Sequence, residues 1–515
     1  MSRKGELMHN DLVKRIVIHV GIIGLVLTCR PHLHSVAAQQ FATKPPVTMH
    51  PHDLDASYIR MPLPPSEQQY GRLDGDHLRQ IVGDITAISR MSRDAGDVVW
   101  GRMAGTKYDD MVEGLVESRF KQLGLTNVHR QYFDLPTQSF PTVCEVKATG
   151  GGRTLQFTTV QPVTPFVATP AGGLDVEAVW VGLGTEGDFA GRDVRGKVVV
   201  VQSMPMPGVV AHSAAYNGSA KRAAERGAAA MLLNVAIPGN YRVAAYSGAD
   251  ALPSFSIGTD DMTALQKMMS AGPVRVQARM NVDTRSGLRD ANVWGELPGT
   301  TDEDILVMAH HDAYFDGALD NASGMAVMIG LAEYFSKIPK EQRRRTIKFV
   351  TTSGHHAGSL GTKWMHDNRA TVLAKTALAI NCEHVAVTQA YFDRMSPTLH
   401  MSDNIDARRW WVNGSSQLAT IVLNAYRLFG VTIYDTMDPT TTADMAVMDR
   451  DVPSIQLIES AVYYHTDHDT VAVVPAPGLA AVARAYAKVI DQVNTLPLSA
   501  LMPSPPKATS QAPGW

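Results

Sequence analysis

Cysteine is scarce in this chain of 515 residues, which contains three. Cys29 lies in an N-terminal segment that we expect to be removed, so the mature chain would keep only Cys144 and Cys382. Two cysteines are too few for the disulfide framework of a small exported domain. We interpret both as buried free thiols, and a single bridge between them is the alternative that the sequence leaves open.

Long apolar runs are lacking as well. The most apolar N-terminal stretch, Ile16–Cys29, is too short to cross a bilayer comfortably. Two basic residues precede it and the small residues Ser35–Ala38 follow it, which is the order of a secretory signal peptide. We therefore predict that residues 1–38 direct export to the periplasm or the extracellular space. The mature chain would have no transmembrane anchor, and lipid attachment at Cys29 is an alternative.

Basic charge is not concentrated anywhere in the chain. The formal net charge is −3, and removal of residues 1–38, with five Lys/Arg and two Asp/Glu, lowers it to −6. The longest basic run, Arg343–Arg345, reads as the solvated end of a loop before a strand. Without a basic stripe interleaved with aromatic residues, the sequence predicts no nucleic-acid partner.

The pattern of apolar residues divides the chain into segments. Helical spacing occurs at 66–93 and 107–123, and short strands separated by Gly and Pro occupy about 140–285. After residue 286, strands and helices alternate, which predicts a mixed, largely parallel α/β sheet flanked by helices. The predicted segments are a signal peptide (1–38), the N-terminal part of the main domain with a helical lead-in (39–140), a β-rich insert (141–285), the rest of the main domain (286–495) and a disordered tail (496–515).

Every predicted strand of the main domain ends in a metal-ligand type of residue. The carboxyl ends of parallel strands meet at one sheet edge, so these side chains should converge as the ligands of zinc or a similar divalent ion do. Taken singly, Asp320 also fits a helix N-cap, Glu383 an ion-pair partner and His465 a loop residue. The strand-end clusters are His310-His311-Asp312, Asp320, His355-His356, Glu383-His384 and His465.

Three of these segments resemble a known family. The stretches AHHDAYFDGALDNASG, GHHAGSLGT and YHTDHDT, in this order, are similar to the motifs of the M28 family of zinc-dependent exopeptidases, which includes aminopeptidases and the glutamate carboxypeptidase group. The insert at 141–285, with its GKVV, GAAA and LPSFSI stretches, resembles a protease-associated (PA) domain. The resemblance implies a two-zinc hydrolase that acts on peptide or amide substrates.

The resemblance also implies roles for individual residues. The first zinc would be held by His310, Asp320 and Glu383, and the second by Asp320, His356 and His465. Asp312 would orient His310, as a carboxylate behind a metal-bound imidazole does. The family has Glu-Glu where this chain has His355-His356, so His355 takes the position of the general base. Asp444 falls where the family has the Asp of a Ser-Asp pair.

Because His355-His356 replaces the Glu-Glu pair of the family, the main functional question is whether these histidines support catalysis. Neutral imidazole binds zinc well, so His356 can replace a carboxylate. His355, with an ordinary pKa of about 6.5, can accept a proton near neutrality, although nearby dications lower its pKa. The alternatives are a non-catalytic binding protein with this fold and a metal-dependent amidohydrolase of altered chemistry. The sequence does not choose between aminopeptidase and carboxypeptidase activity, and it leaves the oligomeric state open, with a dimer among the options.

Overall fold

The structure, a computed structural model, describes residues 62–204, 218–248, 252–392, 399–458 and 462–502. The predicted signal peptide and its alternative lipid-attachment residue Cys29 lie outside these residues. Within them, no helix combines the length and the apolar character needed to cross a membrane. Cys144 and Cys382 are free thiols, Cys382 being buried and Cys144 only partly so.

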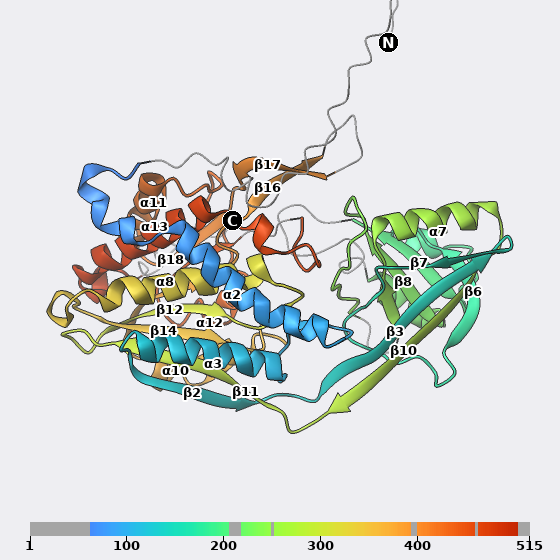
Figure 1. Ribbon diagram of the computed structural model, residues 1–515, viewed down its shortest axis with the longest axis horizontal. Helices are drawn as coiled ribbons and strands as arrows, with labels where there is room; N and C mark the ends of the chain where they lie inside the picture. The colour runs from blue at the N-terminus through green and yellow to red at the C-terminus, as the bar shows by residue number, and fades with distance from the viewer. Residues whose placement is uncertain (1–61, 205–217, 249–251, 393–398, 459–461, 503–515) are drawn as a thin grey trace, which may run out of the picture. The chain divides into compact units, whose positions relative to one another are not determined.

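The main sheet has seven strands (Figure 1). Its four neighbouring strands β19, β15, β12 and β14 are parallel, and the antiparallel strands β18 on one side and β11 and β2 on the other complete it. The predicted mixed α/β sheet is therefore confirmed. In spatial order the strands are β18 (Arg409–Asn413), β19 (Ser454–Ile458), β15 (Thr376–Cys382), β12 (Asp304–His310), β14 (Thr346–Thr352), β11 (Arg289–Leu297) and β2 (Thr126–Asp134).

Helices cover both faces of the main sheet because its strands are apolar on both sides. On β12, Ile305 and Val307 pack into one hydrophobic cluster, and Leu306 and Met308 pack into another. Such two-sided strands need a helical layer on each face. The larger layer consists of α2 (Gly75–Asp94), α3 (Lys107–Gln122), α8 (Gly324–Ser336), α11 (Ser416–Phe429) and α13 (Ala476–Asn494), and the smaller one includes α9 (Leu360–Asp367), α10 (Arg369–Val372) and α12 (Met445–Met448).

A second sheet, with eight strands, is built from residues 138–285. The sequence predicted a β-rich insert over 141–285, and its assignment as a PA domain stays a prediction. Its helices are α4 (Glu186–Phe189), α6 (Ser219–Glu225) and α7 (Thr259–Ala271). In spatial order its strands are β4 (Arg153–Gln156), β3 (Gln138–Gly150), β10 (Arg275–Arg285), β6 (Leu174–Trp180), β7 (Val198–Ser203), β8 (Ala230–Val235), β9 (Ser254–Ser256) and β5 (Gln161–Pro162).

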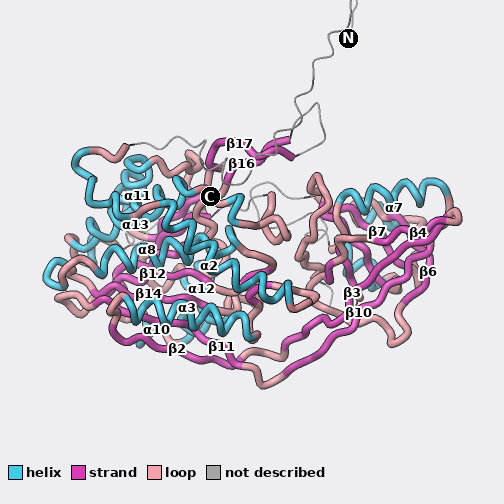
Figure 2. The backbone as a smooth tube through the Cα atoms, in the orientation of Figure 1, coloured by secondary structure: helices cyan, strands magenta, loops and turns pink. Residues whose placement is uncertain are grey.

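The two sheets are joined by strands that run on from one to the other (Figure 2). Only residues 135–137 separate β2 from β3, and only residues 286–288 separate β10 from β11. The insert also touches the main domain through a bridge between Val243 and Thr466, and Ala244 N–H donates to the carbonyl oxygen of His465 at 2.9 Å. Residues of the insert are thereby fixed beside a predicted metal ligand.

Two predicted boundaries need correction. The helix expected over 66–93 is interrupted, because a 3-10 helix, η1 (Pro65–Arg72), precedes α2, and Asp74 caps α2 by accepting from His77 N–H. The tail predicted to be disordered from residue 496 is ordered to residue 502, since Leu501 is buried and its carbonyl accepts from Ser415 N–H at 2.9 Å. Residues 503–515 lie outside the described part of the chain.

Candidate metal centre

The predicted ligands come together at the carboxyl ends of the parallel strands. His310 is the last residue of β12, His355 and His356 follow β14, and Glu383 follows β15. Their side chains meet around Asp320, which lies in a short helical turn, η2 (Ala318–Ser323), ahead of α8. The loop after β19 brings His465 to the same point.

Asp320 is at the centre of this group, and burial, a hydrogen bond and nearby imidazoles fix its position and its charge. It is 2% exposed, and its N–H donates to Asp469 Oδ2 at 3.1 Å. Burial alone would raise its pKa, but the imidazoles around it, His384 and His356 foremost, outweigh that effect and hold its pKa well below the usual value. Asp320 is therefore an anion with both oxygens directed at imidazoles.

The two oxygens of Asp320 face different pairs of histidines. Oδ1 lies 3.1 Å from His310 Nε2 and 3.0 Å from His384 Nε2. Oδ2 lies 3.0 Å from His465 Nε2 and 3.7 Å from His356 Nε2. This is the arrangement expected of a carboxylate shared between two cation positions. His384 was not among the ligands predicted from the sequence, although it directly follows Glu383 in a strand-end cluster.

Glu383 completes the Oδ1 side of the group. Its Oε2 accepts from Asn381 Nδ2 at 2.6 Å and from Gln456 Nε2 at 3.1 Å. Its Oε1 is buried without a hydrogen-bond partner in the described residues. Ligand atoms of His310, Glu383 and His384 lie within 4.8 Å of one another, and so do those of His310, Asp320 and His356.

Several nitrogen and oxygen atoms of these residues are buried without a hydrogen bond, and this shows whether the residues are suited to bind zinc. Buried polar atoms are normally hydrogen-bonded, and leaving them unpaired is costly. Neutral imidazole and carboxylate are zinc ligands, and burial lowers the pKa of both His356 and His465, which keeps them neutral. The donor set therefore fits zinc. Among the described residues, the buried atoms here without a hydrogen bond are His310 Nε2, His356 Nε2, His465 Nε2, Asp320 Oδ1 and Oδ2, and Glu383 Oε1.

His355 is held differently from its neighbour His356. Its ring stacks on that of His310, with centroids 3.8 Å apart and planes at 9°, and its Nδ1 lies 2.9 Å from Asp444 Oδ1. Asp444 Oδ2 accepts in turn from Thr352 Oγ1 at 3.0 Å. Burial favours neutral His355, but the carboxylates Asp444 and Glu383 outweigh it and raise the pKa of His355 to about 9. An Asp-His pair of this kind fixes one tautomer and leaves Nε2 available for proton transfer.

Asp312 contacts the site mainly through the histidine loop. Its two carboxylate oxygens accept from the backbone N–H groups of His355 at 3.1 Å and His356 at 3.0 Å. His310 Nδ1 lies 3.1 Å from the Asp312 carbonyl oxygen and 3.7 Å from its carboxylate. The predicted orienting contact thus involves the backbone carbonyl more closely than the carboxylate, because the carboxylate already holds the loop.

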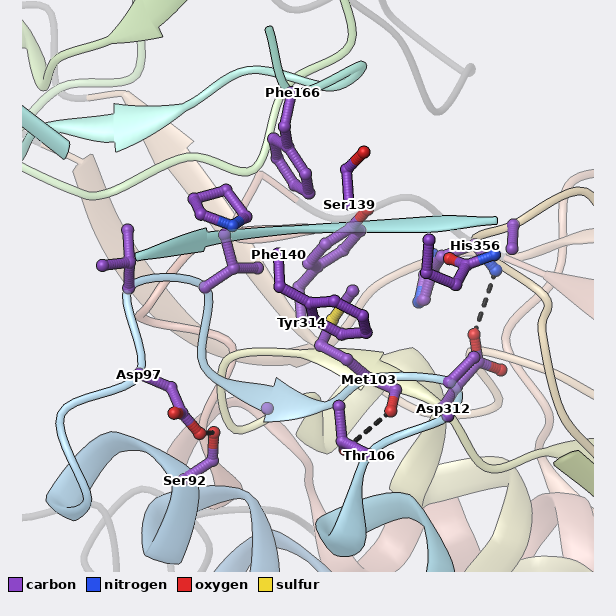
Figure 3. A pocket seen from close by; sticks show the side chains of 18 of the residues that line it. Ser92, Asp97, Met103, Thr106, Ser139, Phe140, Phe166, Asp312, Tyr314 and His356 are labelled. Carbon is purple, nitrogen blue, oxygen red and sulfur yellow. Dashed lines mark hydrogen bonds between the residues drawn. The ribbon is translucent and has the colours of Figure 1, made fainter. Parts of the chain in front are cut away.

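A cavity of about 710 Å³ opens beside His356 and Asp312. Figure 3 shows these two side chains at one end of the cavity, with Phe140, Phe166 and Tyr314 along it. Phe166 belongs to the insert, so the insert and the main domain both contribute to the lining. The cavity walls carry apolar side chains, such as Phe140, Phe166 and Tyr314, together with the cations Lys107 and Arg285 and the carboxylates Asp97 and Asp312.

Sequence comparison relates this geometry to known proteins. Residues 292–490 match the model of peptidase family M28. The chain is 24% identical over 365 residues to a probable glutamate carboxypeptidase of Zea mays, covering 58% of this chain and 50% of that protein. It is 22% identical over 310 residues to carboxypeptidase Q of Mus musculus, covering 56% and 62% respectively. The chain thus matches about half of the first relative's length and less than two thirds of the second's.

Solved structures share the fold. A peptidase M28 precursor from Shewanella amazonensis SB2B has a TM-score of 0.66 at 18% identity, covering 89% of this chain and 100% of that one. The zinc aminopeptidase BSAP of Bacillus subtilis has a TM-score of 0.60 at 19% identity, covering 84% and 98%. The family match covers the part of the chain that contains the metal-centre residues described above. Residues 292–490 are therefore similar to peptidase family M28, the family whose motifs the sequence resembles.

Proposed function

We propose that this protein is a metal-dependent exopeptidase that hydrolyses a peptide or amide bond near one end of its substrate. The observation that carries the proposal is the convergence of four histidines on the two oxygens of one buried carboxylate, Asp320. The family assignment and the names of the relatives, which include carboxypeptidases and a zinc aminopeptidase, agree with it. The apolar segment Ile16–Cys29 supports export of the enzyme.

Two zinc ions would be bound on the two sides of Asp320. The Oδ1 side offers His310, Glu383 and His384, and the Oδ2 side offers His356 and His465. We add His384 to the ligands inferred from the family pattern because its Nε2 approaches Asp320 Oδ1 as closely as His310 Nε2 does. When bound, zinc supplies Lewis acidity, which polarises a carbonyl group and acidifies water.

His355 is the proposed general base. Its Nδ1–H donates to Asp444, so Nε2 can accept the proton that the attacking water loses and deliver it to the leaving amine. Without metal, the nearby carboxylates raise the pKa of His355 to about 9. Dications close by act in the opposite direction and bring the pKa back toward the range in which a general base works.

The cavity beside His356 is the proposed binding site for the substrate. Apolar walls such as Phe140, Phe166 and Tyr314 fit an apolar side chain next to the scissile bond. The lining contains two cations, Lys107 and Arg285, and two carboxylates, Asp97 and Asp312, so its charge does not select one end of a peptide. Carboxypeptidase and aminopeptidase activity are therefore assayed side by side.

The experiment combines metal analysis with peptide assays on the full chain. We expect about two zinc ions per chain and release of terminal residues from a panel of peptides blocked at either end. His355→Gln should retain zinc and lose activity by roughly 10²–10⁴-fold, the usual contribution of a general base. His465→Gln should lose zinc and activity together.

The exposed His468, three residues beyond His465, offers a matched control, because its Nδ1 contacts Asp467 rather than the centre. His468→Gln should keep both zinc and activity. Zinc binding without hydrolysis of any peptide would replace peptidase activity by altered amidohydrolase chemistry. A chain that binds no zinc and cleaves nothing would leave a binding function for this fold.

A further inference from the structure

A second group of ligand-type side chains lies on the other side of β12 from the metal centre. His311 follows His310 directly and points away from it, as neighbouring residues of an extended strand do. It meets Asp109 and Glu113 of α3 and Asp290 of β11. All four residues are at most 4% exposed.

The spacing of these side chains suits one metal ion. One ligand atom from each of the four residues lies within 4.8 Å of all the others. His311 Nε2 is 3.4 Å from Asp109 Oδ1 and 3.8 Å from Glu113 Oε1. Within the described residues, neither ring nitrogen of His311 has a hydrogen-bond partner, and neither has Asp109 Oδ1. A fully buried, unpartnered imidazole is therefore directed into the carboxylates.

The remaining contacts of the carboxylates do not neutralise them. Ser353 Oγ lies 2.9 Å from Asp109 Oδ2 and 2.7 Å from Asp290 Oδ2, but its single hydrogen can satisfy only one of them. Arg130 donates to Glu113 Oε2 at 2.8 Å and is the cation that contacts the group within the described part of the chain. The N–H groups of Gly105 and Ala291 also donate to Asp290 or Glu113 without adding a full charge.

Three buried carboxylates with one guanidinium need further positive charge. Burial raises the pKa of Asp109 well above its usual value, and the neighbouring Asp290 and Asp312 add to this effect. Such a group binds either protons or a cation. A shared proton would have to join His311 Nε2 and Asp109 Oδ1 across 3.4 Å, which is long for a hydrogen bond, whereas a metal ion would bind both atoms at the same time.

We propose that Asp109, Glu113, Asp290 and His311 bind one divalent transition-metal ion of the Zn²⁺ type, separate from the centre around Asp320. An imidazole with carboxylates is typical of zinc and disfavours calcium and magnesium, which prefer oxygen ligands. The ion would tie α3 to β11 and to the end of β12. Through Ser353 it would also hold the start of the loop that carries His355 and His356.

The test measures zinc per chain by mass spectrometry in a background without the main centre. The full chain with His310→Gln, Asp320→Asn and His465→Gln, which lacks ligands on both sides of the main centre, is saturated with Zn²⁺ and dialysed. We expect about one zinc per chain to remain, and we expect His311→Gln in this background to remove it. His366→Gln, at a half-exposed histidine paired with Asp451, is the matched control and should retain the ion.

A second variant provides an independent test in case His311→Gln does not fold. Glu113→Gln keeps the shape of its side chain and should also remove the ion, while circular dichroism checks that each variant is folded. Zinc should raise the melting temperature of the background protein but not of either variant. A background protein that holds no zinc, or zinc content that does not change with His311→Gln and Glu113→Gln, would overturn the proposal in favour of a proton-sharing cluster.

Discussion

Two adjacent histidines differ in charge because different groups surround them. Burial lowers the pKa of His356 well below its usual value, which leaves a neutral ring that can bind metal. His355 is also buried, but Asp444 at 2.9 Å and Glu383 at 3.8 Å raise its pKa to about 9. The two adjacent His residues alone do not predict this difference in pKa, because Glu383 comes from the segment after β15 and Asp444 from the residue before α12.

The raised pKa of His355 predicts a pH-dependent stability in the metal-free protein. The folded pKa of about 9 lies above the ordinary value of 6.5, so the stabilisation is complete below pH 6.5 and is lost as the pH rises through 9. The loss should amount to roughly 1–3 kcal/mol, because a tenfold change in proton affinity corresponds to about 1.4 kcal/mol. Urea unfolding in EDTA at pH 6 and pH 9.5, with wild type and His355→Gln, measures it.

The variant should show a smaller fall in unfolding free energy between these two pH values than the wild type. His129→Gln, at a mostly exposed histidine of β2, should behave like the wild type. If His355→Gln and the wild type lost stability equally, His355 would not carry the additional proton in the folded state.

At the scale of elements, the close packing of α8 on β15 determines how near Asp320 and Glu383 lie to each other. Gly324 begins α8, and a Cβ built there would lie 2.0 Å from the carbonyl oxygen of Cys382, the last residue of β15. Asn321 Nδ2 donates to the same carbonyl oxygen at 2.9 Å. The helix therefore packs against the strand end with no room for a side chain, and the two halves of the metal centre are held by this contact.

Gly324→Ala should destabilise the protein by about 1–3 kcal/mol, the usual cost of overpacking a core, because neither backbone can move freely. It should also lower the zinc content, since α8 would separate Asp320 from Glu383. Gly83, inside α2, is the matched control, because a Cβ added there would meet no atom within 4 Å. Gly83→Ala should raise stability by up to about 1 kcal/mol through helix propensity.

Denaturant unfolding and zinc analysis of the two variants measure both effects. If both variants showed equally small changes in unfolding free energy and zinc content, the contact between α8 and β15 could widen at little cost in free energy. In that case the close approach would not determine the geometry of the centre.

At the scale of the whole molecule, the cavity is lined by residues of both the insert and the main domain. The insert contributes Phe166 and Arg285. The main domain contributes Tyr314, His356 and Asp312, which Figure 3 labels together with Phe166. Arg285 stacks on Phe140, with its guanidinium carbon 4.4 Å from the ring centroid. Because the insert lines the cavity, we expect it to affect which substrates bind and not how the bond is broken.

Phe166→Ala should therefore raise KM for substrates with a bulky apolar side chain, by roughly tenfold for each 1.4 kcal/mol of lost contact. Its kcat should change by less than about threefold, and its zinc content should stay the same, because Phe166 is not among the metal-centre residues. Steady-state kinetics on apolar and small substrates measures the split. Tyr132→Ala, at a half-exposed aromatic of β2 outside the cavity lining, serves as the control. A fall in kcat with unchanged KM would assign the insert to the chemical step instead.

Much of this protein is determined by its sequence alone. The apolar strands, their order and the ligand-type residue after each of them predict the α/β sheet and the edge at which His310, Asp320 and Glu383 meet. These features are local, because strand period and strand ends can be recognised from neighbouring residues. The family resemblance, now confirmed over residues 292–490, rests on the same local segments.

Other features were decided only by the tertiary structure. His384 approaches Asp320 through a turn with φ of 46°, Asp444 reaches His355 across 89 positions of the chain, and Asp109 meets His311 from a helix about 200 residues earlier. Each of these contacts joins segments whose separation no local pattern specifies. The sequence therefore predicted a metal centre, while the packing of distant elements brought together its histidine-rich candidate ligands, the Asp-His pair and the buried cluster around His311.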